Sequence, residues 1–240
     1  MGNSYFAFKQ FTIHQEQTAM KVCTDACLLG AICSNEISKA PHSIHRILDI
    51  GTGTGLLALM LAQESNAQID AVESNRAAAQ QALQNIQLSP WKANIRLIEK
   101  DIHALEPTEP YDFIISNPPF FESDLKSNDP AKNAAKHDSE LTLSELVQQI
   151  YRLLKSAGTA AVLIPYHRTG YFETLLAEAD LHIFKKISVQ QSSQHTFFRS
   201  ILFFKKEKTR IETSEINIMD KGRTYSATFT GLLQPFYLKL

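Results

Sequence analysis

The stretch SNPPFF, residues 116–121, combines a carboxamide, a rigid backbone and aromatic rings. The preceding YDFII is a short apolar run that predicts a buried strand. Two prolines cannot continue a hydrogen-bonded ladder because each lacks a backbone N–H donor. We therefore expect Asn117 at the tip of a strand. Its side-chain oxygen and the Pro118 carbonyl can accept the two N–H bonds of an exocyclic amino group, and the Phe120 ring can stack on the base that carries that group.

An exocyclic amino group on an aromatic base is a poor nucleophile, because its lone pair is delocalised into the ring. Two acceptors that hold its N–H bonds pull the nitrogen toward tetrahedral geometry and free the lone pair. The prolines stiffen the turn, so the positions of the two acceptors are fixed before the substrate binds. No general base is needed, because the proton can leave to water. Asn117 and Phe120 are therefore predicted to position the reacting base. In the alternative interpretation, the prolines only end a strand and the phenylalanines pack.

A glycine-rich turn in LDIGTGTG, residues 48–55, predicts a ligand site upstream of SNPPFF. Gly51 and Gly53 let a backbone approach a ligand closely. Dinucleotide sites and methyl-donor sites share such a turn, so the turn alone does not separate them. Glu73 ends the next predicted strand, where a carboxylate can accept both ribose hydroxyls. Asp101 ends the strand after that, where it can accept from an adenine amino group.

The carboxylates Asp49, Glu73 and Asp101 suit a cofactor that has a positive centre and no phosphate. S-adenosylmethionine fits this description, with an adenosine, an ammonium group and a sulfonium. The three carboxylates would repel the pyrophosphate of NAD, so a dehydrogenase is the weakest alternative. In the other interpretation, Glu73 and Asp101 only cap the turns that follow them.

Hydrophobic periodicity predicts the elements that position these residues. Predicted strands alternate with predicted helices over most of the chain, and the last two strands follow each other without a helix between them. The predicted strands are 46–50, 68–73, 94–100, 111–116, 159–165, 182–189 and 199–206. The predicted helices include 24–33, 56–65, 75–88, 142–158 and 171–179, the fourth with Thr142 and Glu145 as a capping box and Gly158 as its end.

This alternation predicts a Rossmann-like α/β fold with helices on both faces of a mostly parallel, seven-stranded sheet. The final hairpin predicts one antiparallel strand near the edge. In such sheets the ligand lies at the carboxyl ends of the strands. The glycine turn, Glu73, Asp101 and Asn117 all follow strand ends, so we expect them to meet at one edge.

Composition and cysteine content are typical of a globular protein in a reducing compartment. The chain has 240 residues, of which 44% are hydrophobic and 20% are charged, as in one large domain. Its three cysteines crowd into residues 23–33, which argues against a disulfide framework. Cys23 and Cys27 can share a helix face, and we interpret them as packing residues rather than metal ligands. No apolar run is long enough to predict a transmembrane helix.

The formal net charge of −1 excludes a globally basic nucleic-acid binder, but the charge is uneven. Residues 199–240 hold eight Lys or Arg and four Asp or Glu, which gives a charge of +4. The other residues hold 16 Lys or Arg and 21 Asp or Glu, which gives a charge of −5. A basic end on an acidic body indicates a local anionic partner, although a solvated surface explains the same count.

LDIGTGTG followed by SNPPFF is similar to class I methyltransferases that modify planar nitrogens, with their Asn-Pro-Pro-aromatic motif. The N-terminal FKQFTIHQEQTAMKVCTDACLLGA and the terminal YSATFTGLLQPFYLKL are similar to segments that are specific to a narrower family. By these segments the sequence resembles the bacterial tRNA1(Val) adenine-N6 methyltransferase family. This resemblance implies a cytoplasmic enzyme that uses S-adenosylmethionine and methylates N6 of the adenine 3′ of the anticodon in a valine tRNA.

The resemblance also implies roles for individual residues. It implies that Thr24 and Asp25 close over the methionine end of the cofactor, and that Ile102 offers its backbone amide. The family usually has glycine before that threonine and after the aspartate, where this chain has Cys23 and Ala26. The other cofactor contacts that it implies are Asp49, Gly51, Gly53, Glu73, Asp101 and Asn117. The aromatic of the catalytic motif, often tyrosine in the family, is Phe120 here.

The predicted organisation is one methyltransferase domain, with a closing segment at 1–45, a cofactor-binding core at 46–206 and a basic extension at 207–240. Basic residues that can reach RNA phosphates are Lys126, Lys132, Lys136, Lys205, Lys206, Lys221 and Arg223. No obligate protein partner is evident. The core motifs also fit methylation of guanine N2 in ribosomal RNA, of adenine N6 in DNA or of a glutamine amide in a protein. A non-catalytic RNA-binding protein on the same fold is a further alternative.

Overall fold

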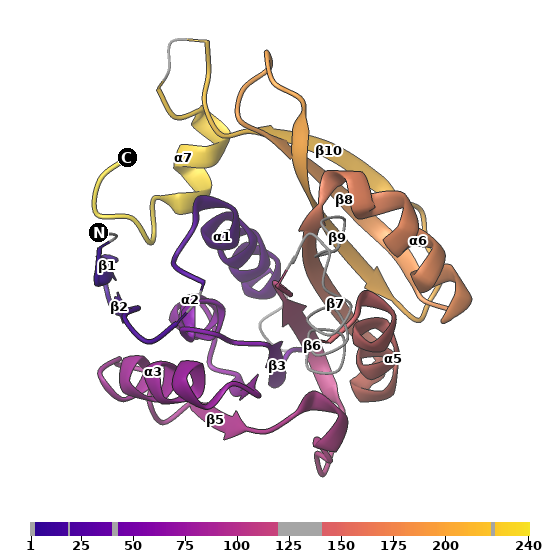
Figure 1. Ribbon diagram of the computed structural model, residues 1–240. Helices are drawn as coiled ribbons and strands as arrows, with labels where there is room; N and C mark the ends of the chain where they lie inside the picture. The colour runs from indigo at the N-terminus through magenta and orange to yellow at the C-terminus, as the bar shows by residue number, and fades with distance from the viewer. Residues whose placement is uncertain (1–2, 19, 40–42, 120–140, 222–223) are drawn as a thin grey trace, which may run out of the picture.

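The structure, a computed structural model, describes residues 3–18, 20–39, 43–119, 141–221 and 224–240. Strands and helices alternate along the described chain (Figure 1). They are β1 (Tyr5–Ala7), β2 (Thr12–His14), α1 (Thr24–Ser38), β3 (Arg46–Ile50), α2 (Leu56–Gln63), β4 (Gln68–Glu73), α3 (Arg76–Gln87), β5 (Ile95–Glu99), η1 (Ile102–Ala104), β6 (Tyr111–Ser116), α5 (Leu143–Leu153), β7 (Leu154–Pro165), η2 (Tyr166–Arg168), α6 (Thr169–Glu178), β8 (His182–Gln190), β9 (Phe197–Lys205), β10 (Glu212–Asn217) and α7 (Ala227–Leu233).

The main sheet has the strand order β10-β8-β9-β7-β6-β3-β4-β5. All neighbouring strands in it are parallel except β9, which is antiparallel to both β7 and β8. Seven strands therefore end at one edge, which we call the carboxyl edge, and start at the other, the amino edge. Strand β9 starts at the carboxyl edge. The predicted fold class, with one antiparallel strand near the edge, is confirmed.

The number of strands differs from the prediction, because the described residues form eight strands in this sheet instead of seven. The additional strand is β10, which pairs in parallel with β8 and lies in the predicted C-terminal extension. Only Ile216 of β10 is buried, so its sequence ETSEIN lacks the apolar run by which the other strands were recognised. The helix after it, α7, contacts α1 and β10.

The two faces of the sheet carry separate hydrophobic cores, because strand side chains alternate between faces. Ile47 of β3 packs with α1, α2, α3 and α7 on one face, and Leu48 packs with α5 and α6 on the other. Figure 1 shows these two helical layers on opposite sides of the sheet. Both faces must be covered for strands this apolar, which explains the doubly wound arrangement.

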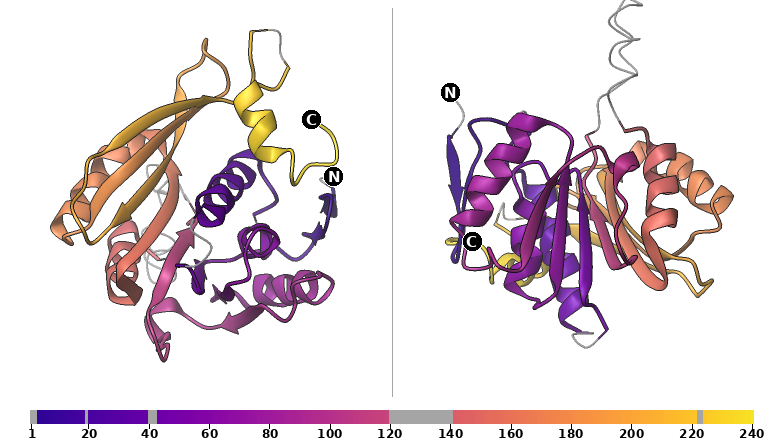
Figure 2. Two further views of the ribbon diagram at one scale, coloured as in Figure 1. Left: turned by 180° about the vertical axis from the view of Figure 1, so that it is seen from behind. Right: turned by 90° about the horizontal axis from the view of Figure 1, so that it is seen from below.

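The two ends of the chain lie together, as Figures 1 and 2 show from different sides. Phe8 and Tyr237 form an antiparallel bridge, and Lys9 N donates to the Phe236 carbonyl at 2.8 Å. The short sheet β1-β2 adjoins α3, where Asn85 exchanges hydrogen bonds with the His14 backbone at 2.9 Å. Among the described residues, none of the helices is long and apolar enough to cross a bilayer.

Helix α5 has the predicted capping box: Thr142 Oγ1 accepts from Glu145 N at 3.2 Å, and Glu145 Oε2 accepts from Thr142 N at 2.8 Å. Its predicted end at Gly158 is wrong. The helix ends at Leu153, and Gly158 lies in β7, where a side chain would meet the backbone oxygen of Tyr111. The glycine therefore serves close strand packing.

Candidate active site

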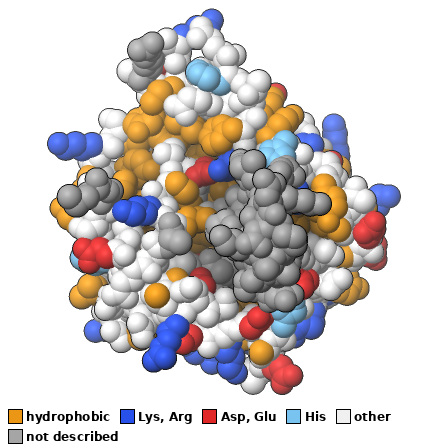
Figure 3. All heavy atoms as spheres, in the orientation of Figure 1, with side chains coloured by type: hydrophobic (Ala, Val, Ile, Leu, Met, Phe, Trp, Pro, Cys, Tyr) orange, Lys and Arg blue, Asp and Glu red, His pale blue; other side chains and the backbone are white. Residues whose placement is uncertain are grey.

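The carboxyl edge brings the predicted site residues together from four adjacent strands. Ile50 of β3 is in register with Val72 of β4 and with Ser116 of β6, and Glu73 is in register with Glu99 of β5. The residues that follow these strand ends include the glycine turn, Asp101 and Asn117. Figure 3 shows this side of the molecule, where hydrophobic side chains gather in the upper half and many charged ones lie around the rim.

The turn after β3 has the backbone conformation that its glycines allow. Gly51, Gly53 and Gly55 have φ of +70°, +57° and +82°, which side-chain-bearing residues rarely adopt. The Gly51 and Thr52 amides both donate to the Val72 carbonyl, at 2.9 and 3.0 Å, and so fix the turn against β4. A Cβ on Gly51 would meet no atom within 4 Å. The turn therefore presents bare backbone to open space.

Asp49 lies beneath this turn and is fully buried. Its Oδ2 accepts from Thr52 Oγ1 at 2.6 Å and from Ala58 N at 3.2 Å. Burial raises the pKa of the Asp49 carboxyl to about 7, with the nearby Glu73 carboxylate acting in the same direction and the two hydrogen bonds acting against it. Its Oδ1 is buried without a hydrogen-bond partner. An orphaned carboxylate oxygen at a strand end is typical of a site that expects a donor from a ligand.

Glu73 holds the two turns beside it through separate oxygens. Oε2 accepts from Gly53 N and Oε1 accepts from Asn75 N, each at 2.9 Å. Each carboxylate oxygen has a second lone pair, which leaves acceptor capacity for ribose hydroxyls. Glu73 therefore caps turns, as the alternative interpretation required, and keeps the capacity to bind a ligand.

Asp101 is the N-cap of η1, the short helix that begins at Ile102. Its Oδ1 accepts from His103 N at 2.8 Å and lies 2.7 Å from His103 Nδ1. These hydrogen bonds lower the pKa of the carboxyl, so it is ionised at neutral pH. The side chain is 64% exposed and both contacts use one oxygen, so the carboxylate is accessible from solvent.

Asn117 directly follows β6, as predicted. Ser116 Oγ donates to the Ile50 carbonyl at 2.9 Å and ties this strand end to β3. The Asn117 amide nitrogen lies 3.8 Å from Met20 Sδ, so the segment before α1 reaches the turn at Asn117. Pro118 is buried, which fixes the backbone after Asn117. Phe120 lies outside the described residues.

Thr24 and Asp25 form the first turn of α1, which starts at the carboxyl edge after the N-cap residue Cys23. Asp25 Oδ2 accepts from Arg199 Nε at 2.7 Å, in an ion pair where the two side chains are 12% and 28% exposed. The sequence did not point to Arg199, because the pair joins β9 to a helix 174 positions away. Met20 was missed for the same reason, since no local pattern marks a contact to Asn117.

The cysteines of α1 behave as packing residues. Burial raises the pKa of the Cys23 and Cys27 thiols to about 12, so both are protonated and unreactive at neutral pH. No cluster of three or more His, Cys, Asp or Glu occurs in the part of the chain that the structure describes.

Comparison with known proteins identifies the family. A model of the family described as "Methyltransferase small domain" matches residues 34–191. A tRNA1(Val) (adenine(37)-N6)-methyltransferase of Cytophaga hutchinsonii is 41% identical over 100% of both chains. One of Dyadobacter fermentans is 40% identical over 99% of this chain and 98% of its own. This chain belongs to the tRNA1(Val) adenine-N6 methyltransferase family.

Solved structures share the fold of this methyltransferase at low sequence identity. A predicted O-methyltransferase from Agrobacterium tumefaciens has a TM-score of 0.67 at 16% identity, over 88% of this chain and 96% of its own. A 16S rRNA N2 G1207 methyltransferase from T. thermophilus, in complex with AdoMet and guanosine, has a TM-score of 0.58 at 19% identity. The match covers 86% of this chain and 52% of that protein. These matches confirm the predicted fold class.

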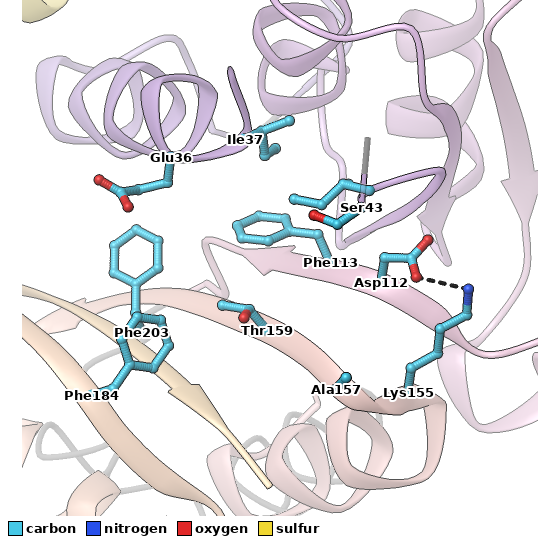
Figure 4. A pocket seen from close by; sticks show the side chains of 11 residues that line it. Glu36, Ile37, Ser43, Asp112, Phe113, Lys155, Ala157, Thr159, Phe184 and Phe203 are labelled. Carbon is cyan, nitrogen blue, oxygen red and sulfur yellow. Dashed lines mark hydrogen bonds and ion pairs between the residues drawn. The ribbon is translucent and has the colours of Figure 1, made fainter. Parts of the chain in front are cut away.

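A pocket of about 270 Å³ lies at the amino edge of the methyltransferase sheet and takes no part in this site. Figure 4 shows Asp112 and Lys155 on one side of it, joined by an ion pair of 2.7 Å. Phe113, Phe184 and Phe203 also line it. Asp112 is the second residue of β6 and Asn117 follows the last, so the pocket and the turn at Asn117 lie at opposite ends of one strand.

The predicted RNA-contacting residues are divided between the two edges. Lys205 ends β9 at the amino edge, where it pairs with Glu207 at 3.1 Å, and Lys206 Nζ donates to the Leu154 carbonyl at 2.8 Å. Lys221 follows β10 and lies beyond the carboxyl edge, on the side of Asn117. Lys126, Lys132, Lys136 and Arg223 lie outside the described residues.

Proposed function

We propose that this methyltransferase transfers a methyl group from S-adenosylmethionine to N6 of the adenine 3′ of the anticodon in tRNA1(Val). The observation that carries the proposal is the 41% identity over the full length of a relative that is named for this activity. Asn117, beside a glycine turn at the same sheet edge, supplies the chemistry that the activity requires. Since the substrate is a tRNA, we also propose a cytoplasmic location.

The donor set at the carboxyl edge fits S-adenosylmethionine. The unpartnered Oδ1 of Asp49 and the bare Gly51 backbone are features that a ligand with a cationic, hydrogen-bond-donating end would complete. We assign the ribose hydroxyls to Glu73 and the adenine amino group to Asp101. The remaining proposed contacts are Thr24, Asp25, Gly53, Ile102 and Asn117. When bound, S-adenosylmethionine supplies a methyl group that its sulfonium makes electrophilic.

The chain's own contribution to the reaction is to position the adenine. The Asn117 side-chain oxygen and the Pro118 carbonyl would accept the two N6–H bonds, and Phe120 would stack on the ring. With its lone pair freed, N6 would form the new bond to the methyl carbon while the bond between that carbon and the sulfonium breaks. The electron pair of the broken bond would stay on sulfur, which becomes a neutral thioether, and one N6 proton would pass to water. Because the stiff turn sets both acceptors in advance, little reorganisation is needed in the transition state.

Methyl transfer from labelled S-adenosylmethionine into total tRNA lacking modifications tests the proposal. The expected product is N6-methyladenosine in a valine tRNA, identified by mass spectrometry and absent with Asn117→Ala. Parallel reactions with unmodified ribosomal RNA, DNA and a glutamine-containing protein substrate test the alternative acceptors. Methylation of one of these and not of tRNA would overturn the proposed acceptor. Tight RNA binding without any methyl transfer would indicate a non-catalytic protein.

A further inference from the structure

On the side of the catalytic turn that faces away from the proposed cofactor residues, two aromatic side chains form a pair. The mechanism proposed above assigns no role to this pair. Tyr166 follows the end of β7, and Phe197 starts β9 at the carboxyl edge. Their ring centroids lie 5.1 Å apart with the planes inclined at 39°. Tyr166 is 39% exposed. Neither ring belongs to the two hydrophobic clusters formed by the described residues, so the pair is not explained by core packing.

A β-bulge aims Phe197 at Tyr166. Along β9, Arg199 is in register with Val189 of β8, but the next register pair is Phe197 with Gln190. Phe198 is the extra residue, and its ring packs against the cluster on the α1 face. A bulge of this kind changes the direction of the following side chain and is frequent next to active sites. Without it, strand alternation would turn Phe197 to the α1 face, together with Arg199 and Ile201.

The position of the pair relative to Asn117 indicates what it meets. Strand β7 adjoins β6, and Val162 is in register with Ser116, so Tyr166 lies one strand away from the catalytic turn at the same edge. The glycine turn, Glu73 and Asp101 lie on the other side of Asn117, on β3, β4 and β5. The cofactor residues and the aromatic pair therefore flank the catalytic turn from opposite sides.

The surroundings of the pair are rigid and include a cation. Thr169 Oγ1 and Ser200 Oγ are buried and lie 2.7 Å apart, which ties the segment after Tyr166 to β9. Arg168 Cζ lies 5.3 Å from the ring centroid of Tyr171, a side chain that is 51% exposed. Exposed aromatic rings with an adjacent guanidinium are the usual means of holding single-stranded nucleotides, by base stacking and a phosphate contact.

We propose that Tyr166, supported by Phe197, stacks on a nucleobase of the RNA loop next to the target adenine and so helps to select the substrate. This inference rests on the proposed function. An extruded base must leave its stack before it can reach Asn117, and a neighbouring base that stacks on Tyr166 compensates part of that cost. The ring makes this contact through its face, so the hydroxyl is dispensable.

Steady-state kinetics with unmodified tRNA at saturating S-adenosylmethionine test this role. Tyr166→Leu should raise the KM for tRNA roughly 10-fold, as expected for the loss of one stacked base, while Tyr166→Phe should restore it. Phe197→Leu should act in the same direction, because it removes the support of the Tyr166 ring. Tyr151→Leu is the matched control, since Tyr151 is 42% exposed and belongs to α5, two residues before that helix ends at the amino edge. Equal effects at Tyr166 and Tyr151, or an unchanged KM, would overturn the proposal.

A binding titration separates this proposal from the proposed function. An anticodon stem-loop with 2-aminopurine next to the target adenine should lose fluorescence on binding, because stacking on the tyrosine ring quenches it. Tyr166→Leu should abolish this quenching, and Tyr166→Phe should retain it. Quenching by an enzyme that methylates no tRNA would support the stacking site and reject the proposed function. Methylation of tRNA with equal quenching by the wild type and Tyr166→Leu would reject the stacking site alone.

Discussion

Asp25 in the first turn of α1 accepts a hydrogen bond from Arg199 of β9 across 2.7 Å. The pair connects the segment that the family resemblance assigns to cofactor closure with the strand that begins beside Tyr166. Both side chains are largely shielded from water. The Arg199 guanidinium of β9 therefore holds the start of α1 at the carboxyl edge. The ion pair connects the proposed cofactor side of the site with the side that carries Tyr166.

Removing one partner of this pair should destabilise the fold and weaken cofactor binding. We expect Arg199→Ala to lower the free energy of unfolding by about 1–3 kcal/mol, because the shielded Asp25 carboxylate loses a charged donor. Urea unfolding of Arg199→Ala, Asp25→Ala and the double variant measures the coupling. Strictly additive losses would show that the pair contributes nothing. Calorimetry with S-adenosylmethionine should show weaker binding by both single variants.

The positions of the predicted cofactor residues could be foreseen because they depend on local pattern. Each strand that supplies one is a short apolar run, and parallel strands must end at a common edge, so spacing alone assembled Glu73, Asp101 and Asn117. The contacts of these residues with their own turns were foreseen only as an alternative. For Glu73 the turn contacts are confirmed, and the ribose contact stays a prediction for which each carboxylate oxygen keeps a second lone pair.

The parts that the sequence analysis missed depend on tertiary contacts. Strand β10 forms because β8 offers it a free edge, and its own residues carry one buried side chain. The bulge at Phe198 cannot be recognised from a run of aromatic residues, since its register is set by β8. The basic residues near the C-terminus are close in sequence but not in space, because Lys206 follows the end of β9 at the amino edge and Lys221 follows the end of β10 at the carboxyl edge.

Gly158 should be intolerant of substitution although it does not end a helix. A Cβ there would lie 2.8 Å from Leu154 Cδ1 and 2.9 Å from the Tyr111 backbone oxygen, and the backbone cannot yield easily. We expect Gly158→Ala to destabilise the protein by about 1–3 kcal/mol. Gly170→Ala is the matched control, because a Cβ at Gly170 in α6 meets no atom within 4 Å. It should be neutral or stabilising in the same urea titrations.

The two edges of the sheet should differ in their contribution to tRNA binding. We expect Lys221→Gln, at the carboxyl edge, to weaken tRNA binding and to reduce the slope of log K against log salt by about 1. Lys208→Gln is the matched control, because Lys208 is exposed in the turn after β9 at the amino edge. Fluorescence anisotropy at several salt concentrations measures both slopes. A larger change for Lys208 than for Lys221 would place the RNA on the other edge.

The contribution of Asp49 to the stability of the ligand-free enzyme should fall as the pH rises from about 4 to about 7. Its pKa in the folded protein is about 7, against an ordinary value of 3.8. The folded state therefore binds the proton more tightly than the unfolded state, so this contribution is fully present below about pH 4 and is lost as the pH approaches 7. Asp49→Asn keeps the shape and removes the titration. The free energy of unfolding of the wild type minus that of Asp49→Asn, measured by urea titration, should fall between these pH values.

The same carboxyl should make cofactor binding pH-dependent in the opposite direction. S-adenosylmethionine is cationic, so its affinity should rise as Asp49 loses its proton near pH 7. Isothermal titration calorimetry from pH 5.5 to 8.5 measures this dependence, and Asp49→Asn should bind weakly with a flat profile. The wild-type profile minus the Asp49→Asn profile isolates the contribution of this one carboxyl, because all other titrating groups are the same in the two proteins. Parallel profiles for the two proteins would contradict the prediction, because the titration of Asp49 would then have no effect on cofactor affinity.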